Sequence, residues 1–398
     1  MTPDPDVQFR YLVRNADRVV PEEGLLELLR SGRPLRVKLG VDPTAPAVTL
    51  GWAVVLRKLR EFQDLGHTAV LIVGDFTAQV GDPSLQSEAR KRLSAEEVRA
   101  HAQAVLDQFR VILAPERLEI RFNSEWLAPL TMSEVLDLSA KATVAQLLER
   151  EDFSRRFEQG VPISMMEFMY PLLQAYDSVA VRADVELGGS DQLWNLMMGR
   201  TIQERYGQPP QVAMTMPLLV GTDGEHKMSQ SLGNYIGITD PPSEMFGKTM
   251  SIPDHVMVSW FRLVTDLPTE EIDRIEEGLQ KGELHPGEVK RRLAREIVGA
   301  YHGQEAAAAA EAEFDRIFRE GRLPDEIPEH HLGPGSTVSL PAVLREAGMV
   351  GSAGEARRLI AQGGVKIDGE PVSDLEVARA ELVGRVVQVG KRRFVRFV

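Results

Sequence analysis

Several short segments of this 398-residue chain carry polar side chains in the pattern of a ligand site. Three are glycine-containing loops, which read Gly40-Val41-Asp42-Pro43-Thr44, Gly81-Asp82-Pro83 and Gly188-Gly189-Ser190-Asp191-Gln192. Such loops expose backbone amides and acidic side chains where strands end and helices begin, and these positions bind polar ligands in open α/β sheets. Turn chemistry or N-capping would explain any one loop alone. The three together favour a shared site.

A further polar group lies in the segment Tyr170-Pro171-Leu172-Leu173-Gln174-Ala175-Tyr176-Asp177. Its members Tyr170, Gln174 and Asp177 are spaced i, i+4 and i+7, which places them on one face of a helix. That face is either exposed to solvent or directed at a polar ligand.

A glycine-containing loop near residue 227 ends in Lys227-Met228-Ser229-Gln230-Ser231. A loop of this kind can bring its lysine to a phosphate group in a transition state. Taken alone, it is equally consistent with a polar surface loop.

Apolar runs separated by helical patterns predict the elements that carry these loops. We expect strands at 35–41, 68–74, 118–122, 181–187 and 211–220, with a helix at 50–65 and another through 206. Strand, helix and strand within about forty residues form a βαβ unit. The sequence therefore predicts an α/β fold with a parallel sheet over residues 1–235, interrupted by a helical insertion near 125–180.

The rest of the chain predicts a helical region over 236–325, a linker rich in Pro, Gly and His, and a small module over 336–398. The whole chain has a net charge of −13, but this module has ten Lys and Arg residues against seven Asp and Glu. A basic module on an acidic chain favours a phosphate-bearing partner. A solvated charged strand explains the same charge equally well.

Composition excludes several classes of protein. The chain has no cysteine, and therefore no disulfide, thiol nucleophile or cysteine-ligated metal. It has no apolar run of membrane-spanning length and no signal-peptide pattern at its start. We expect a cytoplasmic protein without a membrane partner.

In order and spacing, these segments resemble the class I aminoacyl-tRNA synthetases, and among them the bacterial tyrosyl-tRNA synthetases. The resemblance covers nearly the whole chain and includes "GVDPTAP", "GDFTAQVGDPS", "YPLLQAYDS", "VELGGSDQ" and "KMSQS". The stretch "SAGEARRLIAQGGVKIDG" is similar to a small RNA-binding domain found in a ribosomal protein. The combination of "YPLLQAYDS" with "GGSDQ" is specific to the tyrosine branch.

The resemblance implies roles for individual residues. Asp177 would accept the phenol of tyrosine, whereas Tyr170, Gln174 and Asp82 would hold its ammonium group. The remaining substrate-binding residues would be Lys38, Asp42, Asn123 and Gln192. ATP would contact Gly40, Gly51, Trp52, Asp191, Lys227, Met228 and Ser229, and the catalytic residues would be Thr44, Thr49, Lys227 and Gln230. RNA would bind Arg357, Arg358, Lys366, Lys391, Arg392 and Arg393.

The resemblance also implies domains and partners. Residues 1–235 would form a Rossmann-type catalytic domain, 236–325 an anticodon-binding type of helical domain, and 336–398 the RNA-binding domain. The partners would be tyrosine or a close analogue, ATP with Mg²⁺, tRNA and a second copy of the chain. No metal site built from protein ligands is expected.

The chain departs from the family where phosphate should bind. The first signature, written HIGH, reads Thr49-Leu50-Gly51-Trp52, and the second, KMSKS, has Gln230 in place of its second lysine. Gln86 replaces a basic residue in the loop after Asp82. Because such donors act on the transition state, we expect slow or absent adenylation. Two hypotheses remain: an active ligase with a divergent ATP site, and a paralogue with a different role.

Overall fold

The computed structural model describes residues 3–82, 95–318, 327–390 and 393–398. Gln86, Lys391 and Arg392, which the sequence analysis singled out, lie outside these ranges. The chain divides into two compact units, Met1–Ala307 and Ala308–Val398.

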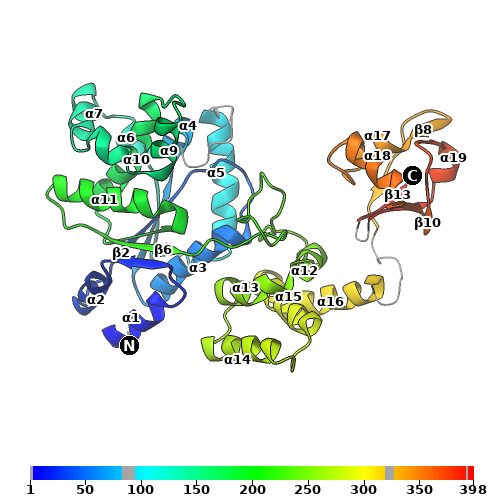
Figure 1. Cartoon of the computed structure of the whole chain (residues 1–398), viewed down its shortest axis with the longest axis horizontal. Helices are drawn as coiled ribbons and strands as arrows, with labels where there is room; N and C mark the ends of the chain where they lie inside the picture. Colours follow the sequence, from blue (N-terminus) through cyan, green and yellow to red (C-terminus); the bar gives the residue numbers. More distant parts are fainter. Residues whose placement is uncertain (1–2, 83–94, 319–326, 391–392) are drawn as a thin grey trace. The chain divides into compact units, whose positions relative to one another are not determined.

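A six-stranded sheet forms the centre of the first unit (Figure 1). Its strands are β1 (Arg18–Val20), β2 (Arg36–Val41), β3 (Thr68–Val73), β4 (Leu118–Phe122), β5 (Val185–Gly189) and β6 (Val212–Met216). They lie in the order β1-β6-β5-β2-β3-β4, and all neighbours are parallel except β1 with β6. The predicted parallel α/β sheet is confirmed.

The strand order reverses beside β2. The chain proceeds from β2 to β3 and β4 on one side, and then places β5 and β6 on the other side of β2. In open α/β sheets, ligands bind beyond the carboxyl ends of the strands at such a reversal. The fold therefore points to the loops that follow β2 and β5.

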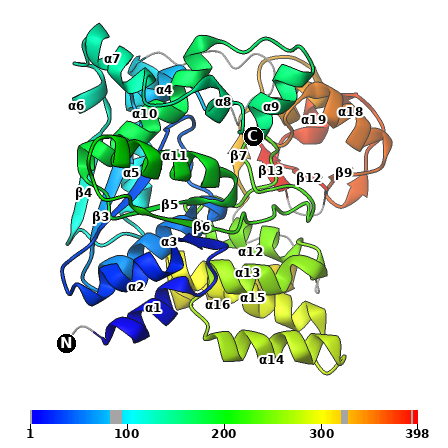
Figure 2. The ribbon, with the colours of Figure 1, turned by 60° about the vertical axis from the view of Figure 1, so that its left-hand side comes forward.

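Helices cover the sheet and form the insertion between β4 and β5. They are α1 (Pro5–Val13), α2 (Glu22–Arg30), α3 (Leu50–Asp64), α4 (Thr77–Val80), α5 (Ala95–Phe109), α6 (Ser124–Leu127), α7 (Met132–Ser139), α8 (Val144–Leu147), α9 (Glu151–Glu158), α10 (Met165–Val181) and α11 (Leu193–Arg205). The helices α10 and α11 pack side by side, as both views show (Figures 1 and 2). Their buried contact includes Leu172, Ala175, Met198 and Ile202.

The helix α10 accounts for one difference from the sequence analysis. A capping box of Ser164 and Glu167 starts this helix, and it continues to Val181 before Arg182 turns the chain with a φ of 50°. The strand expected at 181–187 therefore begins only at Val185. The strand expected at 211–220 is also shorter and ends at Met216.

The first unit continues into helices after the sheet, as predicted. These are α12 (Pro242–Met250), α13 (Met257–Val264), α14 (Thr269–Gln280) and α15 (Pro286–His302), and α16 (Gln304–Phe318) crosses into the second unit. Trp260 of α13 is fully buried, and its indole donates a hydrogen bond of 3.0 Å to the carbonyl of Val220. This contact anchors one end of the loop that contains Lys227.

The second unit is a small α+β fold. Its elements are β7 (Glu329–His330), β8 (Thr337–Ser339), α17 (Leu340–Glu346), α18 (Ala353–Ala361), β9 (Val365–Ile367), β10 (Glu370–Pro371), β11 (Glu376–Ala378), α19 (Arg379–Leu382), β12 (Val386–Val389) and β13 (Arg393–Phe397). One sheet has the order β10-β9-β12-β13-β7, and β11 pairs with β8. Leu344, Ile360 and Phe397 are in its buried core. In the described part of the chain, no helix has the length and apolarity needed to cross a membrane.

Candidate active site at the carboxyl edge of the sheet

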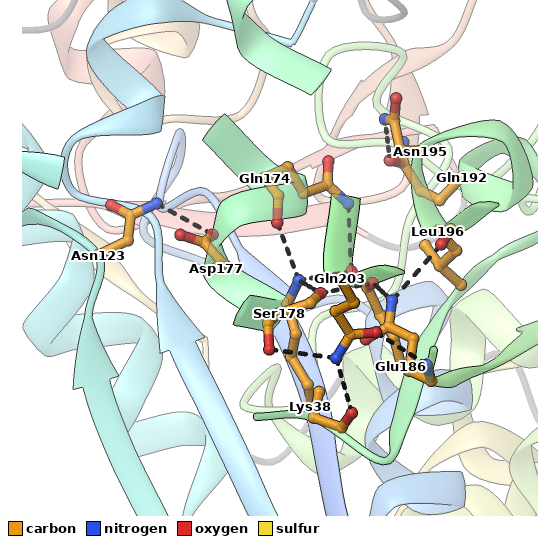
Figure 3. Close-up of polar contacts among 12 residues, drawn as sticks. Lys38, Asn123, Gln174, Asp177, Ser178, Glu186, Gln192, Asn195, Leu196 and Gln203 are labelled. Atoms are coloured by element: carbon orange, nitrogen blue, oxygen red, sulfur yellow. Dashed lines mark hydrogen bonds and ion pairs between the residues drawn. The ribbon is translucent and has the colours of Figure 1, made fainter. Parts of the chain in front are cut away.

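The carboxyl ends of the parallel strands bring the predicted loops together. Asp42 follows β2, Gly74 follows β3, Asn123 follows β4, and Gln192 lies just after β5. The helix α10 adds Tyr170, Gln174 and Asp177 to the same edge. Figure 3 shows several of these side chains and their hydrogen bonds.

Asp177 lies at the centre of one group of contacts. Its side chain is 3% exposed and accepts hydrogen bonds from Trp126 Nε1 at 2.8 Å and from Asn123 Nδ2 at 3.3 Å. Burial raises its pKa to about 7, although the charge of Lys38 and these two hydrogen bonds favour ionisation. A buried carboxyl group of this kind can accept one further hydrogen bond from a ligand hydroxyl.

Asp42 and Tyr170 form a second group beside it. The Tyr170 hydroxyl donates to Asp42 Oδ2 at 2.8 Å, and the Thr77 hydroxyl donates to Asp42 Oδ1 at 2.7 Å. Burial raises the pKa of Asp42 to about 7, opposed by these two hydrogen bonds and reinforced by the charge of Asp82. Gly74 permits this contact, because a Cβ there would lie 2.0 Å from Asp42 Oδ1.

Lys38 belongs to the buried core under the site. Its ammonium group lies 2.8 Å from Glu186 Oε1, and donates to Ser178 Oγ at 2.8 Å and to the carbonyl of Gln174 at 3.1 Å. Lys38 and Glu186 are adjacent partners in the β2–β5 register, so they meet where the strand order reverses. Lys38 was predicted to bind substrate, but its ammonium group is occupied by these three contacts and lies beneath the ligand edge.

Asp82 and Gln192, from the second and third loops, are brought into contact. Gln192 Nε2 donates to Asp82 Oδ2 at 3.2 Å, and Arg150 forms an ion pair of 2.9 Å with Asp82 Oδ1. Burial raises the pKa of Tyr170, and the nearby charges of Asp42, Asp82 and Asp177 raise it further. The three residues predicted to bind the ammonium group differ in their contacts. Tyr170 and Asp82 line this edge, whereas the Gln174 side chain also donates a hydrogen bond to Glu186 at 3.4 Å.

The replaced first signature lies at the start of α3. Thr49 is 2% exposed, and its hydroxyl accepts the backbone N–H of Trp52 at 3.4 Å, which caps the helix. Trp52 is 36% exposed and lies against Phe109, with ring centroids 6.4 Å apart. The Thr49 hydroxyl is therefore engaged in capping α3, and the indole of Trp52 lies on the first turn of this helix.

The second signature lies directly against this turn. Gln230 Nε2 donates to the carbonyl of Ala47 at 2.6 Å, and the Lys227 ammonium group lies 2.9 Å from Asp191 Oδ2. Met228 is buried, and a Cβ on Gly51 would be 3.4 Å from it. Ser229 donates its backbone N–H to Asn234 Oδ1 at 2.8 Å.

A small cavity of about 30 Å³ is lined by residues of both signatures. Its lining includes Thr44, Trp52, Phe109 and Gln230, and none of the described residues around it is lysine or arginine. A volume of this size holds about two water molecules. The indole of Trp52 and the side chain of Gln230 both line this space.

The remaining predicted residues are divided between the two units. Thr44 is exposed, and a Cβ on Gly40 would meet no atom within 4 Å, so both face open space at the sheet edge. In the second unit Arg357 and Arg358 are exposed on α18, and Lys366 is half-buried on β9. Arg393 approaches Glu355, with 3.7 Å between Nη2 and Oε1.

Sequence reasoning missed several residues that hold the site together. Glu186, Trp126 and Arg150 each bind one of the predicted residues, as described above. The sequence offered one indication of Glu186, which is a charged residue inside an apolar strand and therefore needs a buried partner. Trp126 and Arg150 had none, since both lie in the helical insertion without a recognisable pattern.

Comparison with known families defines the class. The family model described as tRNA synthetases class I (W and Y) matches residues 30–319, and the S4 domain model matches residues 338–377. A tyrosyl-tRNA synthetase from Archaeoglobus fulgidus, solved with L-tyrosine, has a TM-score of 0.64 at 25% identity and covers 77% of this chain and 99% of that chain. The parallel sheet with its strand-end site is thus the class I synthetase fold, followed by an S4 domain.

Curated relatives narrow the class further. The tyrosine–tRNA ligase of Moorella thermoacetica is 53% identical over 393 residues, covering 98% of this chain and 95% of its own length. That of Thermotoga maritima is 50% identical, with 98% of this chain and 97% of its own length covered. The chain therefore belongs to the tyrosine–tRNA ligase family of class I synthetases.

The raised pKa of Asp177 predicts a pH dependence of stability. The pKa of an aspartate in the unfolded chain is about 4, so between pH 4 and 7 the folded state binds more protons than the unfolded state. Stability then falls as the pH rises through this window. Asp177→Asn cannot ionise, and should reduce this fall by at most about 4 kcal/mol, with Asp42 supplying what remains. Chemical denaturation of both proteins from pH 4 to 8 measures the difference.

Glu125→Gln is the control of opposite sign. A hydrogen bond from Arg121 lowers the pKa of Glu125, so its contribution to stability is present at neutral pH and is lost only in acid. This variant should leave the slope between pH 5 and 8 unchanged. Equal slopes for the wild type and Asp177→Asn would contradict the raised pKa.

Proposed function

We propose that this chain binds L-tyrosine at the carboxyl edge of its sheet and acts as a tyrosine–tRNA ligase. The observation that carries the proposal is Asp177, a buried carboxyl group that already holds two donors and has room in its hydrogen bonding for a phenol. Phenylalanine would leave that group without its ligand partner, which costs about 2 kcal/mol or roughly thirtyfold in affinity.

The opposite end of the site suits the amino-acid head group. Asp82, Tyr170 and Gln192 converge there, and the charges of Asp42 and Asp82 make the region favourable for an ammonium group. The ligase reaction would begin with attack of the tyrosine carboxylate on the α-phosphate of ATP. No covalent enzyme nucleophile is needed, so the protein contributes orientation and electrostatic stabilisation.

Mg²⁺ would enter this reaction on the phosphates of ATP. Magnesium at phosphoryl-transfer sites commonly uses one or two carboxylates together with substrate oxygens. The part of the chain that the structure describes has no group of three or more His, Asp or Glu side chains arranged around a metal position. Asp191, which lies 2.9 Å from the Lys227 ammonium group, is a carboxylate in contact with the second signature.

A second candidate function is favoured by the phosphate side of the site. Thr49, Trp52 and Gln230 stand where the family has cationic or donor groups. Trp52 and Gln230 line the small cavity, and none of the described residues around it is lysine or arginine. A chain with these replacements would bind tyrosine and RNA, but adenylate slowly or not at all. Such a protein would work as a specialised or regulatory paralogue.

Tyrosine-dependent ATP–pyrophosphate exchange separates the two candidates. We expect slow exchange by the natural chain and an increase of several orders of magnitude in the combined variant Thr49→His, Trp52→His, Gln230→Lys, since each lost donor costs about 3 kcal/mol. Tyrosine affinity, measured by calorimetry, should barely change, because these groups act on the transition state. Each single variant should gain less than the combination, since it restores only one of the three replaced groups.

The control adds Lys227→Ala to the combined variant, and should abolish the gain. Exchange by the natural chain at an ordinary synthetase rate would support the active ligase and exclude the paralogue. A natural chain without preference for tyrosine over phenylalanine would contradict tyrosine binding itself.

We also propose that the second unit binds tRNA through its basic face. The S4 match and the exposed Arg357 and Arg358 support this role. Replacing both with Gln should weaken tRNA binding and reduce the slope of log affinity against log salt by about 2. Filter binding at several salt concentrations measures this slope, and the exposed Arg345→Gln serves as the matched control. An unchanged slope in the double variant would contradict the assignment.

We further propose that the chain forms a homodimer through its helical insertion. This insertion exposes large apolar side chains: Met132, Leu136, Val144, Phe157, Val161 and Met165. Water contact with so many apolar groups is unfavourable, and a second copy can cover them. Light scattering at micromolar concentration should give twice the 44.2 kDa chain mass. Met132→Glu with Leu136→Glu should shift it toward the monomer, whereas Val111→Glu, which lies elsewhere, should not.

A further inference from the structure

Arg150 is a buried charge in the helical insertion, between α8 and α9. Its side chain is 6% exposed, and its guanidinium carbon lies 5.1 Å from the ring centroid of Phe153 and 6.0 Å from that of Trp194. A guanidinium group removed from water in this way is stable only when its donors are paired.

Each of the three nitrogens of its guanidinium group has a partner. Nη2 lies 2.9 Å from Asp82 Oδ1, Nε lies 2.8 Å from Asp152 Oδ1, and Nη1 donates to Asn195 Oδ1 at 3.2 Å. The planar fork of arginine therefore sets the positions of three side chains relative to one another, which a lysine cannot do.

These contacts close into a ring that contains two predicted substrate ligands. From Asn195 the ring continues to Gln192, through Asn195 Nδ2 to Gln192 Oε1 at 2.8 Å, and from Gln192 Nε2 back to Asp82 Oδ2 at 3.2 Å. Figure 3 shows the Asn195–Gln192 part of this ring. Both oxygens of Asp82 are held from the protein side, which fixes the direction in which its carboxylate faces the site.

Two carboxylates, those of Asp82 and Asp152, meet one guanidinium group. The two carboxylates attract a substrate ammonium group and repel a second anion.

We propose that Arg150 is a positioning residue that orients Asp82 to receive the ammonium group of the amino-acid substrate. This inference rests on the proposed tyrosine site. Arg150 acts through Asp82 and does not itself bind the substrate carboxylate. Replacing it should affect ligands that have the ammonium group and spare those that lack it.

The test compares three phenols by calorimetry: tyrosine, tyramine, which lacks the carboxylate, and 3-(4-hydroxyphenyl)propanoate, which lacks the ammonium group. Arg150→Lys keeps the charge but loses the fork. It should weaken tyrosine and tyramine about tenfold and change the propanoate less than threefold. A general loss of structure would weaken all three ligands alike.

Arg156→Lys is the matched control, because Arg156 lies on α9 and pairs with Glu167 (3.2 Å from Nη2 to Oε1), away from Asp82. It should leave all three affinities unchanged. If Arg150→Lys fails to fold, Asn195→Ala opens the same ring and should show the same selectivity with a smaller loss.

Loss of propanoate binding with tyramine unchanged would mean that Arg150 binds the carboxylate directly, and would overturn the inference. Equal effects of Arg150→Lys and Arg156→Lys, in a chain that binds tyrosine, would overturn it as well. A natural chain that binds none of the three phenols would instead refute the tyrosine site, and the inference with it.

Discussion

The buried ion pair of Lys38 and Glu186 is the contact on which the site depends. It joins β2 to β5 at the point where the strand order reverses, and Lys38 also binds the backbone of α10 at Gln174. A buried charge without a partner is strongly destabilising. The strands and the helix therefore keep the arrangement that pairs Lys38 with Glu186. Gly199 of α11 preserves the room for this pair, since a Cβ there would be 3.0 Å from Glu186 Oε2.

The same burial shapes the chemistry above the pair. Asp42 and Asp177 both have a pKa near 7, because the edge removes water from them while supplying only a few donors. A buried carboxyl group with few hydrogen-bond donors readily accepts a hydrogen bond from a phenol or an ammonium group, since the ligand supplies a further donor. The part of the site that contains the two signatures is lined differently. There an aromatic ring from Trp52 and an amide from Gln230 line a small space, and both signatures are hydrogen-bonded to the protein's own backbone.

Much of this site could be read from the sequence because its signals are local. The i, i+4, i+7 spacing placed Tyr170, Gln174 and Asp177 on one helix face, and apolar runs located the strands before each loop. The supporting residues could not be found in this way. Arg150 meets Asp82 across 68 positions and Trp126 meets Asp177 across 51, and neither pairing leaves a periodic trace.

The sequence by itself determined the fold class, the loops at the strand ends and the altered signatures, since each depends on residue type and short-range spacing. Only the tertiary structure decided how those groups are used. It placed Lys38 beneath the site, where its ammonium group is consumed by Glu186, and it turned Thr49 into a helix cap. The physical reason is that burial and pairing are properties of three-dimensional neighbours. The same lysine is a ligand or a support according to which charge the folded chain brings beside it.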